Sequence, residues 1–128
     1  MHSSLSDCFT KENKTLIAEF VTVKVIDVRP LRNYKKRNGK TGKMFIAAIC
    51  DTTYACLAKV YDSEKVTIIQ PNTVLILKDF FIKNGEISIT SKTIASKTGH
   101  LPEIPDDIID KASSLLTGTK STDLSPVS

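Results

Sequence analysis

Residues 43–61 read KMFIAAICDTTYACLAKVY. Two apolar runs, at Lys43–Asp51 and Tyr54–Tyr61, stand on either side of the polar pair Thr52-Thr53. Apolar runs of this length and composition, joined by two turn-forming residues, are typical of a β-hairpin. The stretch therefore predicts two paired strands at the centre of a β-rich domain.

A two-residue turn also sets the register of this hairpin. Ile49 then lies opposite Cys56 and Cys50 opposite Ala55, so the Cys50 and Cys56 sulfurs lie on opposite faces and form no disulfide. The three cysteines and two distant histidines follow no metal-ligand spacing, and we predict no metal site. The side chains predicted to fill the interior are Phe45, Ala47, Ile49, Cys56, Ala58 and Val60, and those predicted to face outward include Met44, Ile46, Lys59 and Tyr61.

Three further segments have the composition of strands. Thr15–Val28 is rich in β-branched residues, and Thr73–Lys83 and Glu86–Thr93 flank Asn84-Gly85, the dipeptide that best fits a tight hairpin turn. The order of five strands, with a long first connection and an irregular segment between the third and fourth, fits one architecture. We predict an all-β fold, a five-stranded OB-fold Greek-key barrel with a C-terminal amphipathic helix.

The first connection is strongly basic. Seven Lys and Arg side chains lie between Arg29 and Lys43, and no Asp or Glu occurs from Val28 to Cys50. We interpret this segment as a long cationic loop that neutralises phosphates and releases their counterions, the alternative being a solvated loop with surplus charge. The candidate nucleic-acid ligands on this loop are Arg29, Arg32, Tyr34, Lys35, Lys36, Arg37, Lys40 and Lys43.

OB-fold barrels usually bind oligonucleotides over the second and third strands and the adjoining loops. Lys59 and Tyr61 face outward on that surface in the predicted register, and Tyr34 lies in the cationic loop. An unpaired base could stack on either tyrosine, which makes single-stranded DNA or RNA an alternative ligand. Tyr54 and Phe81 are interpreted as packing residues.

A different alternative is a protein-interaction module. Four more apolar side chains point outward in the same register, so the outer face of the central hairpin is unusually apolar and needs a cover. The C-terminal helix, a second copy of the chain or another protein could supply it. The candidate partner-binding residues are Ile46, Ala48, Ala55 and Leu57.

The C-terminal part of the chain changes character. Residues 101–118 predict an amphipathic helix, with Pro105 in its first turn, apolar residues at helical spacing and Gly118 at its end. We expect this helix to lay its apolar face on the barrel. The expected organisation is an N-terminal arm at 1–13, one barrel at 14–100, the helix at 101–118 and a disordered polar tail at 119–128.

Charge and missing motifs exclude other classes of function. Residues 1–102 hold 16 Lys and Arg against 9 Asp and Glu, a net charge of +7, whereas residues 103–128 hold 2 against 5, a net charge of −3. No apolar stretch suits a membrane span or a signal peptide, so we expect a nuclear or cytosolic protein that does not bind membranes. No base, nucleophile or nucleotide loop has a recognised spacing, which predicts a non-enzymatic protein without cofactor or small-molecule substrate.

Two sets of residues carry a family resemblance. The first set is Lys43, Met44, Phe45, Ala47, Ile49, Thr53, Lys59, Val60, Tyr61, Asp62, Pro71, Asp79, Phe80, Asn84 and Gly85. The second is Glu103, Ile104, Pro105, Ile108, Ile109, Ala112 and Ser113. Together they resemble the first OB-fold of a HIN domain and the segment that leaves it, as found in interferon-inducible DNA sensors and regulators. A fainter similarity to the barrels of replication protein A places Tyr61 where those proteins often stack a base.

The resemblance implies binding of double-stranded DNA through its sugar-phosphate backbone, with little sequence preference. HIN domains contain two OB-folds and usually follow a death-fold effector domain, whereas this sequence holds one barrel. We therefore expect weaker binding than that of a whole HIN domain. The implied role is a competitor or regulator of HIN-type DNA sensors in innate immunity, with HIN proteins or a second copy as further partners.

Overall fold

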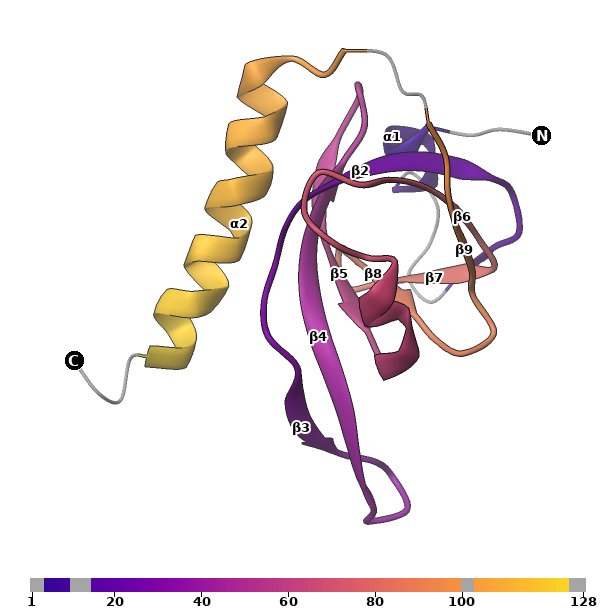
Figure 1. The fold of residues 1–128 in the computed structure, drawn as a ribbon, viewed down its shortest axis with the longest axis vertical. Coiled ribbons are helices and arrows are strands. Elements are labelled where there is room, and N and C mark those ends of the chain that lie inside the picture. The colour runs from indigo at the N-terminus through magenta and orange to yellow at the C-terminus, as the bar shows by residue number, and fades with distance from the viewer. Residues whose placement is uncertain (1–3, 10–14, 100–102, 125–128) are drawn as a thin grey trace.

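A curled sheet with one long helix along its side makes up the structure, a computed structural model that describes residues 4–9, 15–99 and 103–124 (Figure 1). Within these ranges no helix is long and apolar enough to cross a membrane. The elements are α1 (Leu5–Cys8), β1 (Thr15–Ile17), β2 (Val21–Val28), β3 (Arg32–Lys35), β4 (Thr41–Cys50), β5 (Ala55–Val60), the 3-10 helix η1 (Ser63–Thr67), β6 (Val74–Lys78), β7 (Phe80–Lys83), β8 (Glu86–Ile89), β9 (Ile94–Lys97) and α2 (Asp106–Leu124).

The strands pair around a barrel. Their order is β1-β7-β8-β5-β4-β2-β6-β9, with β3 paired to β4, and β6 pairs with β2 before the chain continues into β7 and β8. The β5–β8 pair is parallel and the other pairs are antiparallel. This arrangement confirms the predicted all-β barrel with a C-terminal helix.

Within the described ranges, nine strands replace the predicted five. The first predicted strand divides at residues 18–20 into β1 and β2, and the fourth divides at Asp79, whose φ of 61° takes the chain out of extended geometry. Two short strands, β3 and β9, were not expected. Bends of this kind let one long segment pair with different neighbours at its two ends, as β1 pairs with β7 while β2 pairs with β4 and β6.

The central hairpin has the predicted register. Six residue pairs join β4 to β5, from Phe45 opposite Val60 to Cys50 opposite Ala55. All six side chains predicted to fill the barrel belong to its buried core. Cys50 lies on the opposite face, in a separate apolar cluster, and it and Cys56 are free thiols.

The outer face of this hairpin is covered by α2 (Figure 1). Ala112 and Leu116 of the helix are buried in the second cluster, with Ile108, Ile109 and Leu115 packed against it. The four residues predicted as a partner-binding surface are therefore not available for docking, because the helix already buries them to between 0% and 7% exposure. These residues are Ile46, Ala48, Ala55 and Leu57.

The helix α2 begins at Asp106 and continues to Leu124, through Gly118 at which we expected it to end. Glycine inside a helix costs only about 1 kcal/mol relative to alanine, so one glycine does not oblige the helix to stop. Residues 119–124 of the expected tail are thus helical. Residues 125–128 lie outside the described residues.

Part of the expected N-terminal arm belongs to the core. Leu5 and Cys8 of α1 are fully buried in the main cluster, while residues 1–3 and 10–13 of the arm lie outside the described ranges. The buried Asp51 holds α1 in place: its Oδ2 atom accepts a hydrogen bond from the Leu5 N–H at 2.8 Å, and its Oδ1 accepts from Thr53 N–H at 2.7 Å. The turn after β4 and the N-terminal helix are thereby joined through one carboxylate.

Candidate nucleic-acid interface

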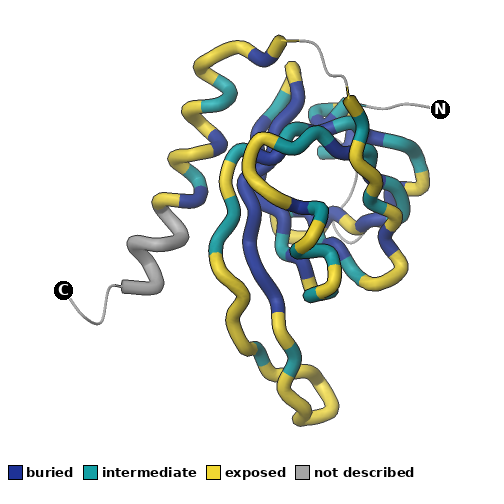
Figure 2. The backbone as a smooth tube through the Cα atoms, viewed as in Figure 1, coloured by how far each residue is buried: buried dark blue, intermediate teal, exposed yellow. Residues whose placement is uncertain are grey.

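The predicted cationic loop is a two-stranded ribbon. Strands β3 and β4 pair from Arg32 opposite Met44 to Lys35 opposite Thr41, and the ribbon extends beyond the barrel (Figure 1). Its end is closed by a hydrogen bond from the Lys36 N–H to the Lys40 carbonyl at 2.8 Å and by Gly39 at a φ of 85°. We call residues 32–44 the basic hairpin. Because its residues are exposed on both faces, no apolar alternation marked β3 in the sequence (Figure 2).

Five cationic side chains are exposed on the basic hairpin beyond Tyr34. In the observed register Lys35 and Lys43 belong to one face of the ribbon, and Lys36 and Lys40 to the other. Arg37 lies in the turn between them. The ribbon thus presents positive charge on both faces, with no acidic side chain within it to neutralise that charge.

Gly42 shapes one face of the basic hairpin. A methyl group at this position would lie 2.7 Å from Lys36 Cε and 2.8 Å from Tyr34 Cε1, closer than real Cβ contacts come. The two side chains therefore lie across the glycine. This packing turns Tyr34 toward the barrel, where its ring meets that of Tyr61 edge to face at a centroid distance of 5.3 Å.

Two clefts lie between the basic hairpin and the outer surface of the barrel, and both include Tyr61 and Thr90. The first has a volume of about 450 Å³, and its lining also includes Lys36 and Asp62. The second has a volume of about 330 Å³, and Phe81 lies in its wall. The cleft residues thus come from the hairpin and from the β5, β7 and β8 region together.

Phe81 is a residue whose role the sequence misidentified. We expected it to be a packing residue, but its side chain is 38% exposed because it lies on the outer face of β7. Its neighbours Phe80 and Ile82 point into the core instead. The sequence did contain a signal for this exposure, because side chains alternate between the two faces of a strand and Phe81 lies between two core residues. Tyr54, by contrast, packs against the core and the Phe9 ring, at a centroid distance of 4.7 Å.

Two predicted ligands are engaged within the protein. The Nη2 atom of Arg29 donates to the Leu116 carbonyl of α2 at 3.4 Å, and its Nε atom is buried and has no hydrogen-bond partner among the described residues. Lys59 forms an ion pair with Glu86 at 3.2 Å. Of the other predicted residues, Tyr34, Lys36, Arg37 and Lys43 line the clefts together with Tyr61. Arg32, Lys35 and Lys40 lie on the basic hairpin outside the cleft linings.

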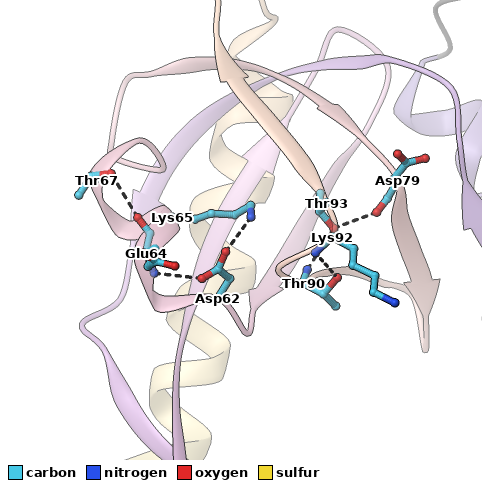
Figure 3. Close-up of polar contacts among 8 residues, drawn as sticks. All are labelled: Asp62, Glu64, Lys65, Thr67, Asp79, Thr90, Lys92 and Thr93. Carbon is cyan, nitrogen blue, oxygen red and sulfur yellow. Dashed lines mark hydrogen bonds and ion pairs between the residues drawn. The ribbon is translucent and has the colours of Figure 1, made fainter.

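Hydrogen bonds stabilise the two segments of the barrel that line the first cleft, around Asp62 and around Thr90 (Figure 3). Asp62 accepts from the Glu64 N–H at 3.2 Å and pairs with Lys65 at 2.8 Å, and this hydrogen bond from Lys65 lowers the pKa of Asp62 below its ordinary value of 3.8. On the other side, the Thr93 hydroxyl donates to the Asp79 carbonyl at 2.9 Å and accepts from the Thr90 N–H at 3.0 Å. The segments that line the first cleft are thus internally braced.

Little in the site suits metal or thiol chemistry. Among the residues that the structure describes, no three His, Cys, Asp or Glu side chains gather where they could hold a metal ion. Burial raises the pKa of the Cys50 thiol to about 11 and raises that of Cys56 well above its ordinary value. Both cysteines therefore remain protonated near neutral pH, and a thiol is a weak nucleophile and metal ligand.

Comparison with protein families gives one match. The model for the HIN-200/IF120x domain matches residues 17–120, most of the chain. A comparison with curated proteins found no match.

Solved structures share the fold. The HINa domain of Ifi202 in complex with 20-bp double-stranded DNA superposes with a TM-score of 0.72 at 24% identity, over 78% of this chain and 52% of that one. The p202 HIN1 domain with 12-mer double-stranded DNA gives 0.71 at 23% identity, over 80% and 51%. The OB domain of Ta0387 from Thermoplasma acidophilum gives 0.60 at 15% identity, over 81% and 91%. The chain thus spans about half the length of the HIN structures that it matches.

Proposed function

Because this chain belongs to the HIN-200/IF120x domain family, we propose that it binds double-stranded DNA through the sugar-phosphate backbone, with little sequence preference. The observation that carries this proposal is the basic hairpin, a ribbon that extends from the barrel with six exposed cations and no acidic residue. The Ifi202 and p202 domains, which share the fold, are seen in complex with double-stranded DNA, and this supports the same ligand class.

The arrangement of charge favours the backbone over the bases as the ligand. Lysines make up four of the six exposed cations, and a lysine contacts a phosphate as a point charge without the planar fork that arginine offers to a guanine edge. Cations on both faces of the ribbon can reach the two phosphate strands that border one groove. Contacts of this kind set position and affinity, while sequence discrimination needs contacts to base edges.

The test is fluorescence anisotropy with a labelled duplex at several salt concentrations. The variant Lys35→Glu/Lys40→Glu removes a cation from each face of the hairpin. We expect weaker binding and a shallower salt dependence. The plot of log affinity against log salt should become less steep by about 1.8, since each phosphate contact contributes about 0.9. The matched control is Lys97→Glu/Lys111→Glu, an equal charge change on β9 and α2.

The comparison of the two variants separates local contacts from overall charge. Equal loss of affinity in both would show that net charge, and not the hairpin, holds the DNA. Unchanged affinity of the hairpin variant at moderate salt would refute the proposal. Duplexes of unrelated sequence should bind the native chain with closely similar affinity, and a strong preference among them would contradict backbone binding.

A further inference from the structure

The two clefts beside Tyr61 extend the basic hairpin surface toward the barrel. Lys36 and Arg37 belong to the hairpin and also line the clefts, Lys36 the first and Arg37 the second. A DNA strand held by phosphate contacts on the hairpin thus has a charged path into the clefts. This inference rests on the proposed function, because it places more of the same ligand next to the same surface.

Aromatic surface is concentrated at these clefts. The side chain of Tyr61 is 36% exposed and that of Phe81 is 38% exposed, and both line the second cleft. Tyr34 meets the Tyr61 ring edge to face, which fixes the orientation of Tyr61 and leaves ring surface open to the cleft. Exposed aromatic faces flanked by cations are the usual platform for unpaired bases.

The charges around Tyr61 suit a nucleotide. Lys83 of β7 lines the second cleft together with Arg37, so a cation comes from each side. Two acids line the first cleft: Asp62 is already paired with Lys65, and Glu64 shares the lining with Lys36 and Lys43. Among the described residues, the lining of the second cleft holds no acid, so its charge suits a nucleotide better. The hydroxyl-bearing residues Ser88 and Thr90 can donate or accept hydrogen bonds at a base edge.

The sizes also fit. At about 450 and 330 Å³ the two clefts lie within the range of roughly 300–1,000 Å³ typical of small-ligand sites. A base pair inside a duplex exposes no free base face, so only an unpaired nucleotide could stack on Tyr61 or Phe81. We propose that these clefts bind an unpaired nucleotide of DNA whose duplex part lies on the basic hairpin, so that the protein prefers duplexes with a single-stranded overhang to blunt ones.

The experiment compares three labelled DNAs in the same anisotropy assay: a blunt duplex, the same duplex with a short 3′ or 5′ overhang, and the overhang strand alone. We expect the native chain to bind one of the overhang duplexes about tenfold more tightly than the blunt one, the effect of stacking one base. Tyr61→Ala and Phe81→Ala should each reduce the ratio of overhang affinity to blunt affinity toward one.

Two further variants serve as controls. Tyr61→Phe keeps the ring face and should preserve the overhang preference. Ile94→Ala changes another exposed apolar residue, one on β9 outside both clefts, and it should alter neither affinity. Loss of the preference in Ile94→Ala would indicate a general surface effect and overturn the assignment to the clefts.

The outcomes distinguish this inference from the proposed function. Blunt and overhang duplexes could bind equally well and both lose affinity in Lys35→Glu/Lys40→Glu. That result would support DNA binding by the basic hairpin and overturn nucleotide binding in the clefts. If the protein bound the overhang strand by itself and had no affinity for a blunt duplex, that result would overturn both the proposed duplex binding and the preference for overhang duplexes. If Tyr61→Ala lowered the affinity for blunt and overhang duplexes by the same factor, that result would also overturn nucleotide binding in the clefts.

Discussion

At the scale of single residues, a few polar side chains hold the loops around the site in place. The pair between Asp62 and Lys65 is the clearest case, because it begins η1 and borders the first cleft. The hydrogen bond from Lys65 lowers the pKa of Asp62. In the unfolded chain this carboxyl regains its ordinary pKa, so the native state is favoured when the carboxyl is ionised.

The pair therefore predicts a pH-dependent coupling. Its stabilisation is fully present above the ordinary Asp pKa near 3.9 and is lost as the pH falls through the lowered native value. A double-mutant cycle with Asp62→Asn and Lys65→Met should give a coupling of about 1 kcal/mol near neutral pH, because the two side chains are 15% and 12% exposed and solvent screens their charges only in part.

Urea unfolding of the four proteins, near neutral pH and again well below the lowered pKa, measures this coupling. It should vanish in acid. A coupling of the same size at both pH values would mean that packing, and not charge, joins the two side chains. The cycle Asp62→Asn with Lys97→Met, which pairs Asp62 with an exposed lysine on β9, should show no coupling at either pH.

At the scale of elements, the most consequential contact is that of α2 with the outer face of β4 and β5. Leu116 is 1% exposed in the cluster that the helix makes with this face. Arg29, just after β2, donates to the carbonyl of the same residue. The helix is therefore part of the folded unit and not an appendage.

Truncation of Leu116 tests this docking. Leu116→Ala should lower the free energy of unfolding by about 2–5 kcal/mol, the usual cost of removing a buried leucine side chain and leaving a cavity. The control Leu16→Ala removes the same atoms from a side chain that is 49% exposed and should cost far less. Urea unfolding measures both, and similar small losses would show that α2 does not stay docked in solution.

At the scale of the whole molecule, the barrel carries a net positive charge and the C-terminal part of the chain a net negative one. Residues 1–102 carry a net charge of +7, while residues 103–128 carry −3. The basic hairpin stands at the positive side of this division. Under the proposed function, a DNA duplex would be attracted to the barrel and repelled by the acidic segment, which would orient the protein on the duplex.

This orientation leads to a prediction about competition. If the chain occupies the phosphate backbone without sequence preference, it should displace a HIN domain such as Ifi202 HINa from labelled duplex DNA as its concentration rises. The variant Lys35→Glu/Lys40→Glu should require a much higher concentration. Because binding is dominated by phosphate contacts, displacement should weaken as salt is raised. A ternary complex on a duplex too short for two proteins would instead indicate protein–protein association.

The sequence by itself determined the central hairpin and the nature of its two faces. The two-residue turn at Thr52-Thr53 was enough to predict the observed pairing of Ile49 with Cys56. The two faces followed from that register, because side-chain direction in a strand depends only on position along it. The helical spacing from Ile108 to Leu116 likewise predicted the apolar face of α2. The concentration of charge between Arg29 and Lys43 was plain from composition.

Only the tertiary structure decided how these parts meet. That α2 covers Ile46 and Leu57, which the sequence left as a docking surface, depends on where the chain returns after β9. The ribbon form of the basic hairpin, the exposure of Phe81 and its sharing of a cleft with Arg37 depend on contacts between residues far apart in sequence. Local patterns record which face of an element is apolar, but not which element will cover it, because that choice is made by packing across the whole chain.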